Sequence, residues 1–275
     1  MEEAGMTASD LAYAFVNAEP MQRQRLKMLE AWLDEGTTRI LDARGLGPGW
    51  RCLEAGAGGG SVAAWLCRRV RPEGSVLATD LDVRFLRELA YPNLELQVHD
   101  LLHDELPERE FDLIHVRLVL SWLAEPDLAL RRLAAALKPG GCLVAEELDF
   151  QSLAVDPRLD ARTRSVFSAV AEAHLAVLSA RHGFDPFYGR RVAADLSAAG
   201  LAGVQAEGRA SWWRGGGYGG RLFMLTLMQL RESIVAAGLV PSADVDESIK
   251  LCEESRLSLV SPVTMAAWGH RPASS

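Results

Sequence analysis

Short apolar runs alternate with helical patterns through the middle of this 275-residue chain, and this alternation restricts the fold more than any other feature. The apolar runs, each read as a strand, are residues 51–54, 75–80, 94–99, 111–116 and 142–147. Helical patterns lie between them at residues 61–70, 82–89 and 126–137. Alternation on this scale predicts βαβ units, and therefore a parallel sheet with helices on both faces.

Three stretches lie outside this alternating core and are read mainly as helices. Residues 1–47 predict one or two helices, residues 151–187 predict another, and residues 204–275 predict a strand at 204–213, two helices and a strand-like ending at 258–268. Since no repeat or low-complexity linker separates them, we expect the extra helices to pack on the sheet as a cap. The predicted domains are 1–47 (helical cap), 48–150 (cofactor-binding core), 151–187 (helical insertion) and 188–275 (remainder of the core, with inserted helices at 218–256).

The composition argues against several broad classes. The formal net charge is −8, which opposes a sequence-independent hold on nucleic acid or on an anionic membrane. No apolar run approaches the roughly 20 residues that cross a bilayer, and the acidic start Met1-Glu2-Glu3 is unlike a basic secretory leader. The four cysteines lie far apart, so neither a disulfide framework nor a zinc site is predicted. We therefore expect a cytoplasmic protein with no nucleic-acid or membrane partner and no bound metal.

A glycine-rich segment follows the first predicted strand and precedes a predicted helix: Leu53-Glu-Ala-Gly-Ala-Gly-Gly-Gly-Ser61. Such a loop lets a ligand approach the backbone amides, and the helix N-terminus favours a negative group. Glycines alone fit dinucleotide sites equally well. Glu54 distinguishes a dinucleotide from a positively charged nucleoside ligand. A carboxylate beside the loop repels a diphosphate but suits a ligand with ammonium and sulfonium charges. S-adenosylmethionine has both charges, so the segment favours it over NAD.

Two further acids lie where predicted strands end, the edge at which open α/β sheets bind ligands. Asp80 is placed to accept from both hydroxyls of a ribose, and Asp100 to accept from an adenine amino group while the Leu101 amide donates to the ring. Taken alone, each acid is more often a turn or helix cap. Their register with Glu54 and the glycines favours the nucleoside-binding interpretation.

Several segments resemble the successive motifs of class I S-adenosylmethionine-dependent methyltransferases, in the small-molecule, quinone-biosynthesis-like branch: residues 52–61, 76–82, 99–101, 111–123 and 137–147. The Glu-x-Gly-x-Gly-x-Gly segment combined with Lys138-Pro-Gly-Gly141 is the most specific part, and residues 261–270 resemble the family's last strand. The resemblance implies a Rossmann-like α/β fold, with a seven-stranded, mostly parallel sheet, an antiparallel last strand and helical cap insertions. It implies these cofactor-binding residues: Glu54, Gly56, Ala57, Gly58, Asp80, Leu81, Asp100, Leu101 and the backbone near Val116 and Arg117.

The residues that would serve the acceptor carry weaker signals. Relatives often have a histidine where this chain has Trp122, so that base is not carried over; Trp122 would line an apolar pocket or pack in the core. His174 interrupts an apolar helix stripe and is a candidate base, with a hydrogen-bonded core histidine as the alternative. Glu147 is a second candidate, with capping or a surface position as the alternative. Tyr13 and Tyr218 are further candidates for acceptor contacts.

The interpretation is a methyltransferase that moves a methyl group from S-adenosylmethionine to an oxygen, nitrogen or carbon of a small, fairly apolar metabolite, with a homodimer as one option for its assembly. His115, inside the fourth predicted strand, is interpreted as structural. Two alternatives keep the fold. One is a homologue that binds S-adenosylmethionine but catalyses a cyclisation or rearrangement, and the other is a non-catalytic protein that binds it.

Overall fold

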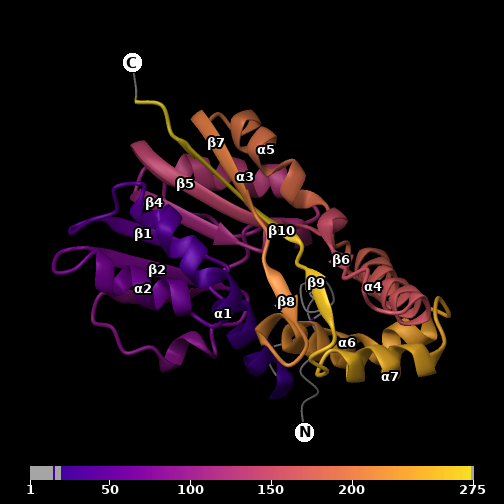
Figure 1. Ribbon diagram of the computed structural model, residues 1–275. Coiled ribbons are helices and arrows are strands. Elements are labelled where there is room, and N and C mark those ends of the chain that lie inside the picture. The colour runs from indigo at the N-terminus through magenta and orange to yellow at the C-terminus, as the bar shows by residue number, and fades with distance from the viewer. Residues whose placement is uncertain (1–14, 16–19, 274–275) are drawn as a thin grey trace, which may run out of the picture. The chain divides into compact units, whose positions relative to one another are not determined.

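The computed structural model describes Phe15 and residues 20–273, and seven strands of this range form one sheet (Figure 1). The strands are β1 (Arg51–Ala55), β2 (Ser75–Asp80), β3 (Leu94–Val98), β4 (Phe111–Arg117), β5 (Leu137–Asp149), β7 (Ala202–Arg209) and β10 (Val263–His270). Their order in the sheet is β3-β2-β1-β4-β5-β10-β7. Neighbours from β3 to β5 pair in parallel, whereas β10 is antiparallel to β5 and β7. The predicted sheet, mostly parallel with an antiparallel last strand, is therefore confirmed.

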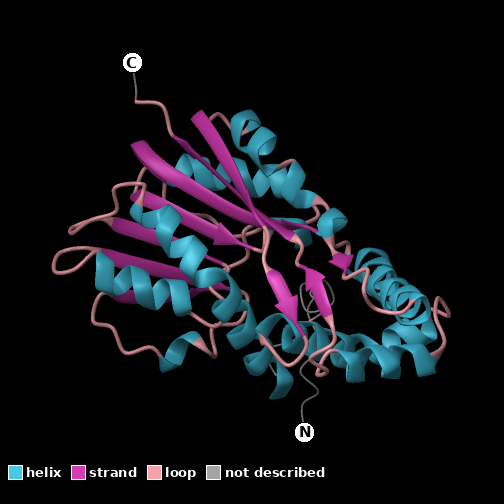
Figure 2. Cartoon of the chain, viewed as in Figure 1, coloured by secondary structure: helices cyan, strands magenta, loops and turns pink. Residues whose placement is uncertain are grey.

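Helices cover both faces of this sheet (Figure 2). Residues 33–42 of α1 (Pro20–Asp42) and helix α2 (Ser61–Arg69) share one buried apolar cluster with the strands. Helices α3 (Pro126–Ala136) and α5 (Val192–Ala198) share a second cluster with the opposite face of the same strands. The sheet is thus the middle layer of a three-layer α/β arrangement, as its strand–helix alternation predicts.

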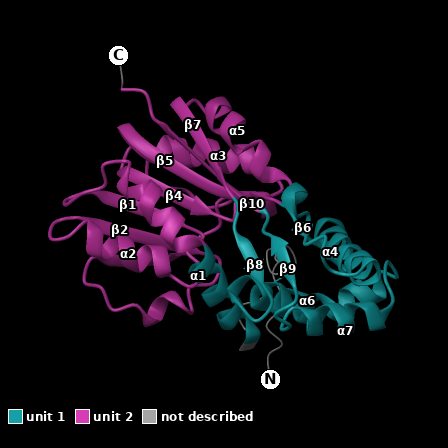
Figure 3. Cartoon of the chain, in the orientation of Figure 1, with its two compact units in different colours: residues 1–32, 150–186, 210–262 teal, residues 33–149, 187–209, 263–275 magenta. Residues whose placement is uncertain are grey.

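The chain divides into two compact units, coloured separately in Figure 3. Of the described residues, unit 2 holds 33–149, 187–209 and 263–273, and it contains the seven-stranded sheet. Unit 1 holds Phe15 with residues 20–32, 150–186 and 210–262. Compared with the predicted boundaries, unit 2 takes in residues 33–47, and the second inserted segment of unit 1 begins at residue 210.

Unit 1 combines helices with a small sheet of its own. Its elements after α1 are β6 (Ala154–Val155), α4 (Ala161–His182), β8 (Trp212–Arg214), α6 (Tyr218–Ala236), α7 (Ser242–Leu251) and β9 (Ser258–Val260). The three strands pair antiparallel in the order β6-β9-β8. In the part of the chain that the structure describes, no helix has both the length and the apolar character needed to cross a bilayer.

The ends of the helices follow local sequence signals. Pro126 opens α3, with the acidic Asp127 in its first turn, as the fixed proline backbone and the helix dipole favour. At the start of α4 the Asp160 side chain accepts a hydrogen bond from the Thr163 amide at 2.9 Å. Gly183 ends α4 with a φ of +66°, a conformation that favours glycine. These boundaries therefore depend on interactions between near neighbours in the sequence.

The helix predicted for residues 82–89 is wrong. Only a short 3₁₀ helix, η1 (Leu86–Glu88), forms there. The Asp80 side chain accepts from the Asp82 amide at 3.1 Å, and the Asp82 side chain accepts from the Arg84 amide at 3.0 Å. Such side-chain bonds offer the backbone an alternative to the helical pattern, which explains why no α-helix begins here.

The single strands predicted for residues 204–213 and 258–268 are each divided between two sheets. The first forms β7 and β8, and the second forms β9 and β10. Between them, the Ser261 amide donates to the Ser211 carbonyl at 2.8 Å, and the Ser211 amide donates to Ser261 Oγ at 2.9 Å. Pro262 follows and has no N–H to continue a ladder. Both chain segments therefore pass from one sheet to the other where Ser211 and Ser261 are hydrogen-bonded.

Candidate functional site

The glycine segment forms a tight loop between β1 and α2, at the carboxyl edge of the parallel strands. Gly56, Gly58 and Gly60 have φ angles of +70°, +55° and +87°, values that are costly for residues with a side chain. The amides of Gly56 and Ala57 both donate to the Thr79 carbonyl, at 2.8 and 2.9 Å. Bonds within the chain thus fix the shape of the loop against the end of β2.

Close packing is a second reason for glycine in this loop. A Cβ atom on Gly56 would lie 2.3 Å from Cγ2 of Val119, in the turn that follows β4. A Cβ atom on Gly60 would lie 2.7 Å from Leu89 and 2.9 Å from Leu86. Real Cβ atoms do not approach this closely, so both positions exclude a side chain unless their neighbours move.

Asp80 ends β2 and holds the same loop. Its Oδ2 accepts a hydrogen bond from the Gly58 amide at 2.8 Å, and burial raises the pKa of its carboxyl group. The predicted residues from Glu54 to Gly58 and Asp80 therefore lie together at one edge of the sheet. The ribose contact assigned to Asp80 stays a prediction, and the loop contact is an additional role.

Asp100 lies beside Asp80, because the His99 amide at the end of β3 donates to the Asp80 carbonyl at 3.0 Å. Its side chain accepts from the Leu102 amide at 2.8 Å and from His103 Nδ1 at 3.0 Å. Partial burial opposes ionisation of Asp100, but these bonds hold its pKa below the ordinary value. The contacts are those of the turn-cap alternative, and the adenine role stays a prediction.

The two predicted leucine positions have different environments. The Leu81 side chain, directly after β2, is 47% exposed. Leu101 is buried and belongs to the apolar cluster under α3 and α5. Of the two, Leu81 has the exposed side chain, and the ligand contacts of both residues stay predictions.

Polar side chains follow apolar ones on the same face of three neighbouring strands. The apolar cluster under α1 and α2 includes these strand residues: Cys52, Leu113 and Val144. Two residues further along each strand, and so on the same face, lie Glu54, His115 and Glu146. All three are buried, with Glu54 only 3% exposed. Buried charges of this kind require partners.

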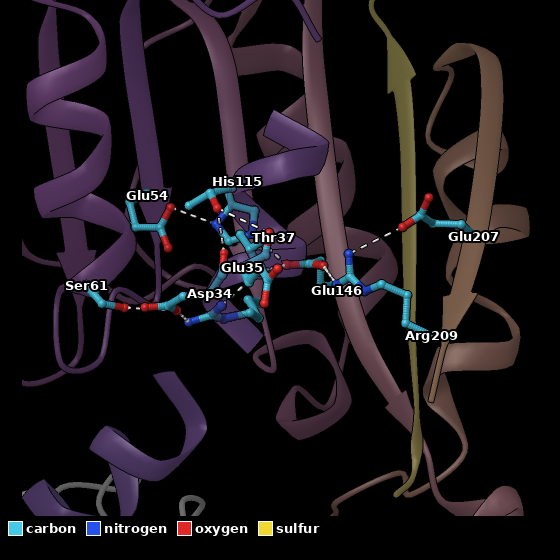
Figure 4. A network of polar contacts seen from close by, with 11 residues as sticks. Asp34, Glu35, Thr37, Glu54, Ser61, His115, Glu146, Glu207 and Arg209 are labelled. Carbon is cyan, nitrogen blue, oxygen red and sulfur yellow. Dashed lines mark hydrogen bonds and ion pairs between the residues drawn. The ribbon is translucent and has the colours of Figure 1, made fainter. Parts of the chain in front are cut away.

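His115 lies between the two carboxylates (Figure 4). Its Nδ1 is 2.7 Å from Glu54 Oε2, and its Nε2 is 3.4 Å from Glu146 Oε2. A neutral imidazole has one N–H, so a ring that donates to two carboxylates carries both protons and a positive charge. Burial alone would lower the pKa of His115, but the carboxylates outweigh it and raise that pKa to about 9.

Helix α1 contributes two side chains to this polar network. Thr37 Oγ1 donates to Glu146 and accepts from Arg117 Nη1 at 2.8 Å. Asp34 accepts from Arg117 Nη2 at 2.9 Å and from Ser61 Oγ at 3.1 Å. Because Ser61 is the first residue of α2, Asp34 joins the end of β4 to the helix that follows the glycine loop.

The network ends on β7, where its ion pairs continue. Arg209 donates to Glu146 and pairs with Glu207, which also pairs with Arg39. Among the described residues, the ion-paired carboxylates here are Glu54, Glu146, Asp34 and Glu207, and their cations are protonated His115, Arg117, Arg209 and Arg39. Glu54 therefore presents a charge compensated by His115 to the loop, and not the bare carboxylate that its sequence position predicts.

Glu147 caps the turn that follows β4. Its Oε1 accepts from the amides of Val119 and Leu120 at 2.9 and 2.7 Å, at the start of η2 (Leu120–Trp122). Glu147 is 0% exposed, and burial raises its pKa to about 7. Of its two alternatives, capping is observed and a surface position is wrong. The role of Glu147 as a base stays a prediction, and its complete burial offers that role no support.

His174 lies in unit 1 and is a buried, hydrogen-bonded histidine. Its Nδ1 contacts the Ala171 carbonyl, and its ring packs edge-on against Phe223 and Phe150 at centroid distances of 5.1 and 6.0 Å. Burial lowers the pKa of His174 to about 4, so the ring is neutral at physiological pH. This arrangement matches the core alternative, and the catalytic role stays a prediction.

The remaining predicted positions are scattered. Val116 is buried in the core, and Arg117 uses its side chain in the polar network. Trp122 is half-buried in η2, and Tyr218 begins α6 as a partly exposed residue. Tyr13 lies outside the described residues.

The sequence analysis missed Asp34 and Thr37, and it read His115 as structural. One signal was available. The polar residues of β1, β4 and β5 follow apolar residues at the same spacing, and alternation along a strand puts them on one face. Nothing in the periodicity of α1 indicated which of its polar residues would face that row.

Comparison with known sequences matches the family described as "Methyltransferase domain" to residues 53–143. The methyltransferase str2 of Strobilurus tenacellus is 30% identical over 150 residues, which is 54% of this chain and 53% of that protein. The ubiquinone/menaquinone biosynthesis C-methyltransferase UbiE of Vibrio campbellii is 32% identical over 125 residues, 42% of this chain and 48% of that protein. The match thus spans about half the length of each of these curated relatives.

Comparison with solved structures finds the same fold. The YcgJ protein of Bacillus subtilis superposes with a TM-score of 0.54 at 15% identity, over 86% of this chain and 98% of that chain. The phosphoethanolamine N-methyltransferase 2 of Haemonchus contortus, in complex with S-adenosyl-L-methionine, superposes with a TM-score of 0.50 at 14% identity, over 98% of this chain and 58% of that chain. At these identities the likeness concerns the fold alone.

Proposed function

Because residues 53–143 of this chain match the methyltransferase domain family on a Rossmann-like sheet, we propose that the protein is an S-adenosylmethionine-dependent methyltransferase. The glycine loop is the observation that carries this proposal. It combines three left-handed glycines, the N-terminus of α2 and the Asp80 carboxylate at one edge of the sheet. A loop of this composition suits a ligand with a carboxylate at one end and ribose hydroxyls at the other.

The residues at this edge fit S-adenosylmethionine. The N-terminus of α2 suits the carboxylate of its methionine part, and the Asp80 carboxylate, which also accepts from the Gly58 amide, suits its ribose hydroxyls. The exposed Leu81 side chain suits an apolar face of the adenine, and Asp100 suits its amino group. When bound there, S-adenosylmethionine supplies an activated methyl group.

The chain's own residues would act mainly by binding and orientation. Methyl transfer is an in-line substitution, so holding the two reactants in line supplies much of the acceleration. A general base is needed only where the acceptor must lose a proton. The burial of His174 and Glu147 leaves neither candidate exposed to donate or accept a proton at a ligand. We therefore propose catalysis through positioning, with no base assigned.

For the acceptor we propose a small, fairly apolar metabolite, methylated at oxygen, nitrogen or carbon. The net charge of −8 argues against nucleic acid as the acceptor. The named relatives include a C-methyltransferase of ubiquinone and menaquinone biosynthesis, which supports a small-molecule acceptor without identifying it.

The direct test combines ligand binding with label transfer. Thermal melting in the presence of S-adenosylmethionine, S-adenosylhomocysteine and NAD(H) should show stabilisation by the first two alone. Label from the S-methyl group should then appear in a product from a panel of small apolar acceptors. Stabilisation by NAD(H) alone would overturn the proposal. Binding of S-adenosylmethionine with an unlabelled, rearranged product would favour the cyclisation alternative, and binding without any turnover would favour a non-catalytic role.

Asp80→Ala is expected to weaken binding of S-adenosylhomocysteine tenfold or more. The carboxylate would lose its ribose bonds, and charge-assisted bonds contribute roughly 1.5–3 kcal/mol. Asp82→Asn is the matched control, because Asp82 lies two residues further on and pairs with Arg84 at the surface. Isothermal titration calorimetry should report a loss for Asp80→Ala and little change for Asp82→Asn. Equal affinities in both variants would remove Asp80 from the binding site.

A further inference from the structure

His115 lies between the buried carboxylates of Glu54 and Glu146. It is far from the glycine loop in the sequence. It contacts Glu54 through Nδ1 and Glu146 through Nε2, so both ring nitrogens face carboxylates. Its side chain is completely buried, and so is that of Glu146. The charge of the imidazolium is therefore compensated by neighbouring side chains and not by solvent.

Four further residues, on β4, β7 and α1, surround this pair. Arg117 on β4 and Arg209 on β7 both act on the Glu146 carboxylate. Thr37 donates to the same carboxylate from α1, and Asp34 on α1 pairs with Arg117. Glu146 is held by three cations and a hydroxyl, whereas within the described residues the Glu54 carboxylate forms its ion pair with His115. His115 is thus the main compensation for Glu54.

The network holds the glycine loop at both of its ends. Glu54 lies two residues before Gly56, so the His115 contact fixes the strand residue that leads into the loop. Ser61, directly after Gly60, is held by Asp34 and through it by Arg117. A change in the charge of His115 would therefore act most directly on the start of the loop, through Glu54.

We propose that His115 is a positioning residue for the cofactor: as an imidazolium it holds the Glu54 carboxylate beside the glycine loop and cancels its charge, and it releases its proton to solvent when a positively charged ligand binds there. This inference rests on the proposed function, because it requires S-adenosylmethionine in the loop. In the free protein Glu54 is paired with His115. In the complex the positive ligand takes over as the counter-charge of Glu54.

The direction in which cofactor affinity changes with pH follows from the coupling between ligand binding and protonation of His115. A positive ligand near Glu54 makes the protonated form of His115 less favourable, so binding and proton release are coupled. The pKa of His115, raised to about 9 in the free protein, would fall on binding. Affinity for S-adenosylmethionine should therefore increase with pH through this range, by about three- to tenfold between pH 7 and pH 9 on the His115 contribution alone. S-adenosylhomocysteine, which lacks the sulfonium charge, should show a smaller effect.

The wild-type protein provides the first test. With ¹³C-labelled histidine, an NMR titration follows each imidazole in the free protein and with saturating S-adenosylhomocysteine or S-adenosylmethionine. The midpoint of His115 should lie above the ordinary histidine value in the free protein and should fall on ligand binding, more with the methylated ligand. An unchanged His115 midpoint in the two complexes would overturn the inference while leaving the proposed function intact. Failure of both ligands to bind would overturn the proposed function itself, and the inference with it.

A substitution provides the second test. His115→Gln keeps a hydrogen-bond donor but removes the charge. His270→Gln is the matched control, because His270 is exposed at the last position of β10, opposite Cys142 of β5. Calorimetry should give a pH dependence of S-adenosylmethionine affinity that is flatter in His115→Gln than in wild type and unchanged in His270→Gln. The ligand's own amino group titrates near pH 8, so the difference between variants isolates the protein's contribution. The same pH dependence in all three proteins would contradict the inference. If His115→Gln does not fold, the NMR titration of the wild type decides.

Discussion

The free energy of unfolding of Glu147→Gln, relative to that of the wild type, is expected to rise by about 3 kcal/mol between pH 4.5 and pH 7. The pKa of Glu147 is raised to about 7 by burial from an ordinary value of 4.5. Between these values the folded state binds more protons than the unfolded state, so the wild-type free energy of unfolding falls as the pH rises. Glutamine cannot ionise, and the variant loses this contribution to the slope.

Denaturant unfolding at a series of pH values measures this difference. Glu105→Gln is the matched control, since it makes the same substitution at an exposed position in the loop after β3. The absolute stability of Glu147→Gln also includes the cost of a buried amide, so the comparison concerns the change with pH and not the value at one pH. A difference between Glu147→Gln and wild type that stays constant from pH 4.5 to 7 would show that Glu147 is ionised throughout.

Gly56→Ala is expected to weaken cofactor binding at least tenfold and to lower the free energy of unfolding by about 2–3 kcal/mol. Two costs add at this position. The residue has a φ of +70°, and its new Cβ would lie 2.3 Å from Cγ2 of Val119. The turn that contains Val119 is anchored by Glu147, so it cannot move away without breaking the bonds to Oε1. The strain would therefore remain in the loop.

Two further variants separate these costs. Gly140→Ala introduces alanine at a φ of +81° with nothing within 4 Å of the new Cβ, so it measures the backbone cost alone. The double variant Gly56→Ala/Val119→Ala makes room for the new methyl group and should recover part of the stability lost by Gly56→Ala. Chemical denaturation and calorimetry with S-adenosylhomocysteine provide both readouts. Equal effects of Gly56→Ala and Gly140→Ala on stability would rule out the contact with Val119.

The strands and the glycine loop could be predicted because their signals are local. Each parallel strand is an apolar run bounded by turn residues, and β2 begins and ends where the sequence predicts. The resemblance to S-adenosylmethionine-dependent methyltransferases is supported by the family match to residues 53–143. The errors arose where a local pattern competes with other contacts, as in the side-chain bonds of Asp80 and Asp82 that replace a helix with η1.

The polar network could not be predicted because its partners are far apart in the sequence. Thr37 is 109 residues from Glu146, and Asp34 is 83 residues from Arg117. Only the folded sheet brings them together. This changes the physical basis of the argument for Glu54: its charge is matched by His115, so selectivity for a positive ligand depends on how readily His115 gives up its proton. The direct role of Glu54 in cofactor binding stays a prediction.

The packing of Gly60 against Leu86 and Leu89 has a consequence for how this segment can evolve. Each leucine approaches the position of a missing Cβ, so the three sites share one small volume. A descendant with alanine at position 60 would need a smaller residue at position 86 or 89 in the same lineage. Substitutions at these sites should therefore occur as compensating pairs, even though η1 itself is too short to impose any helical pattern on its residues.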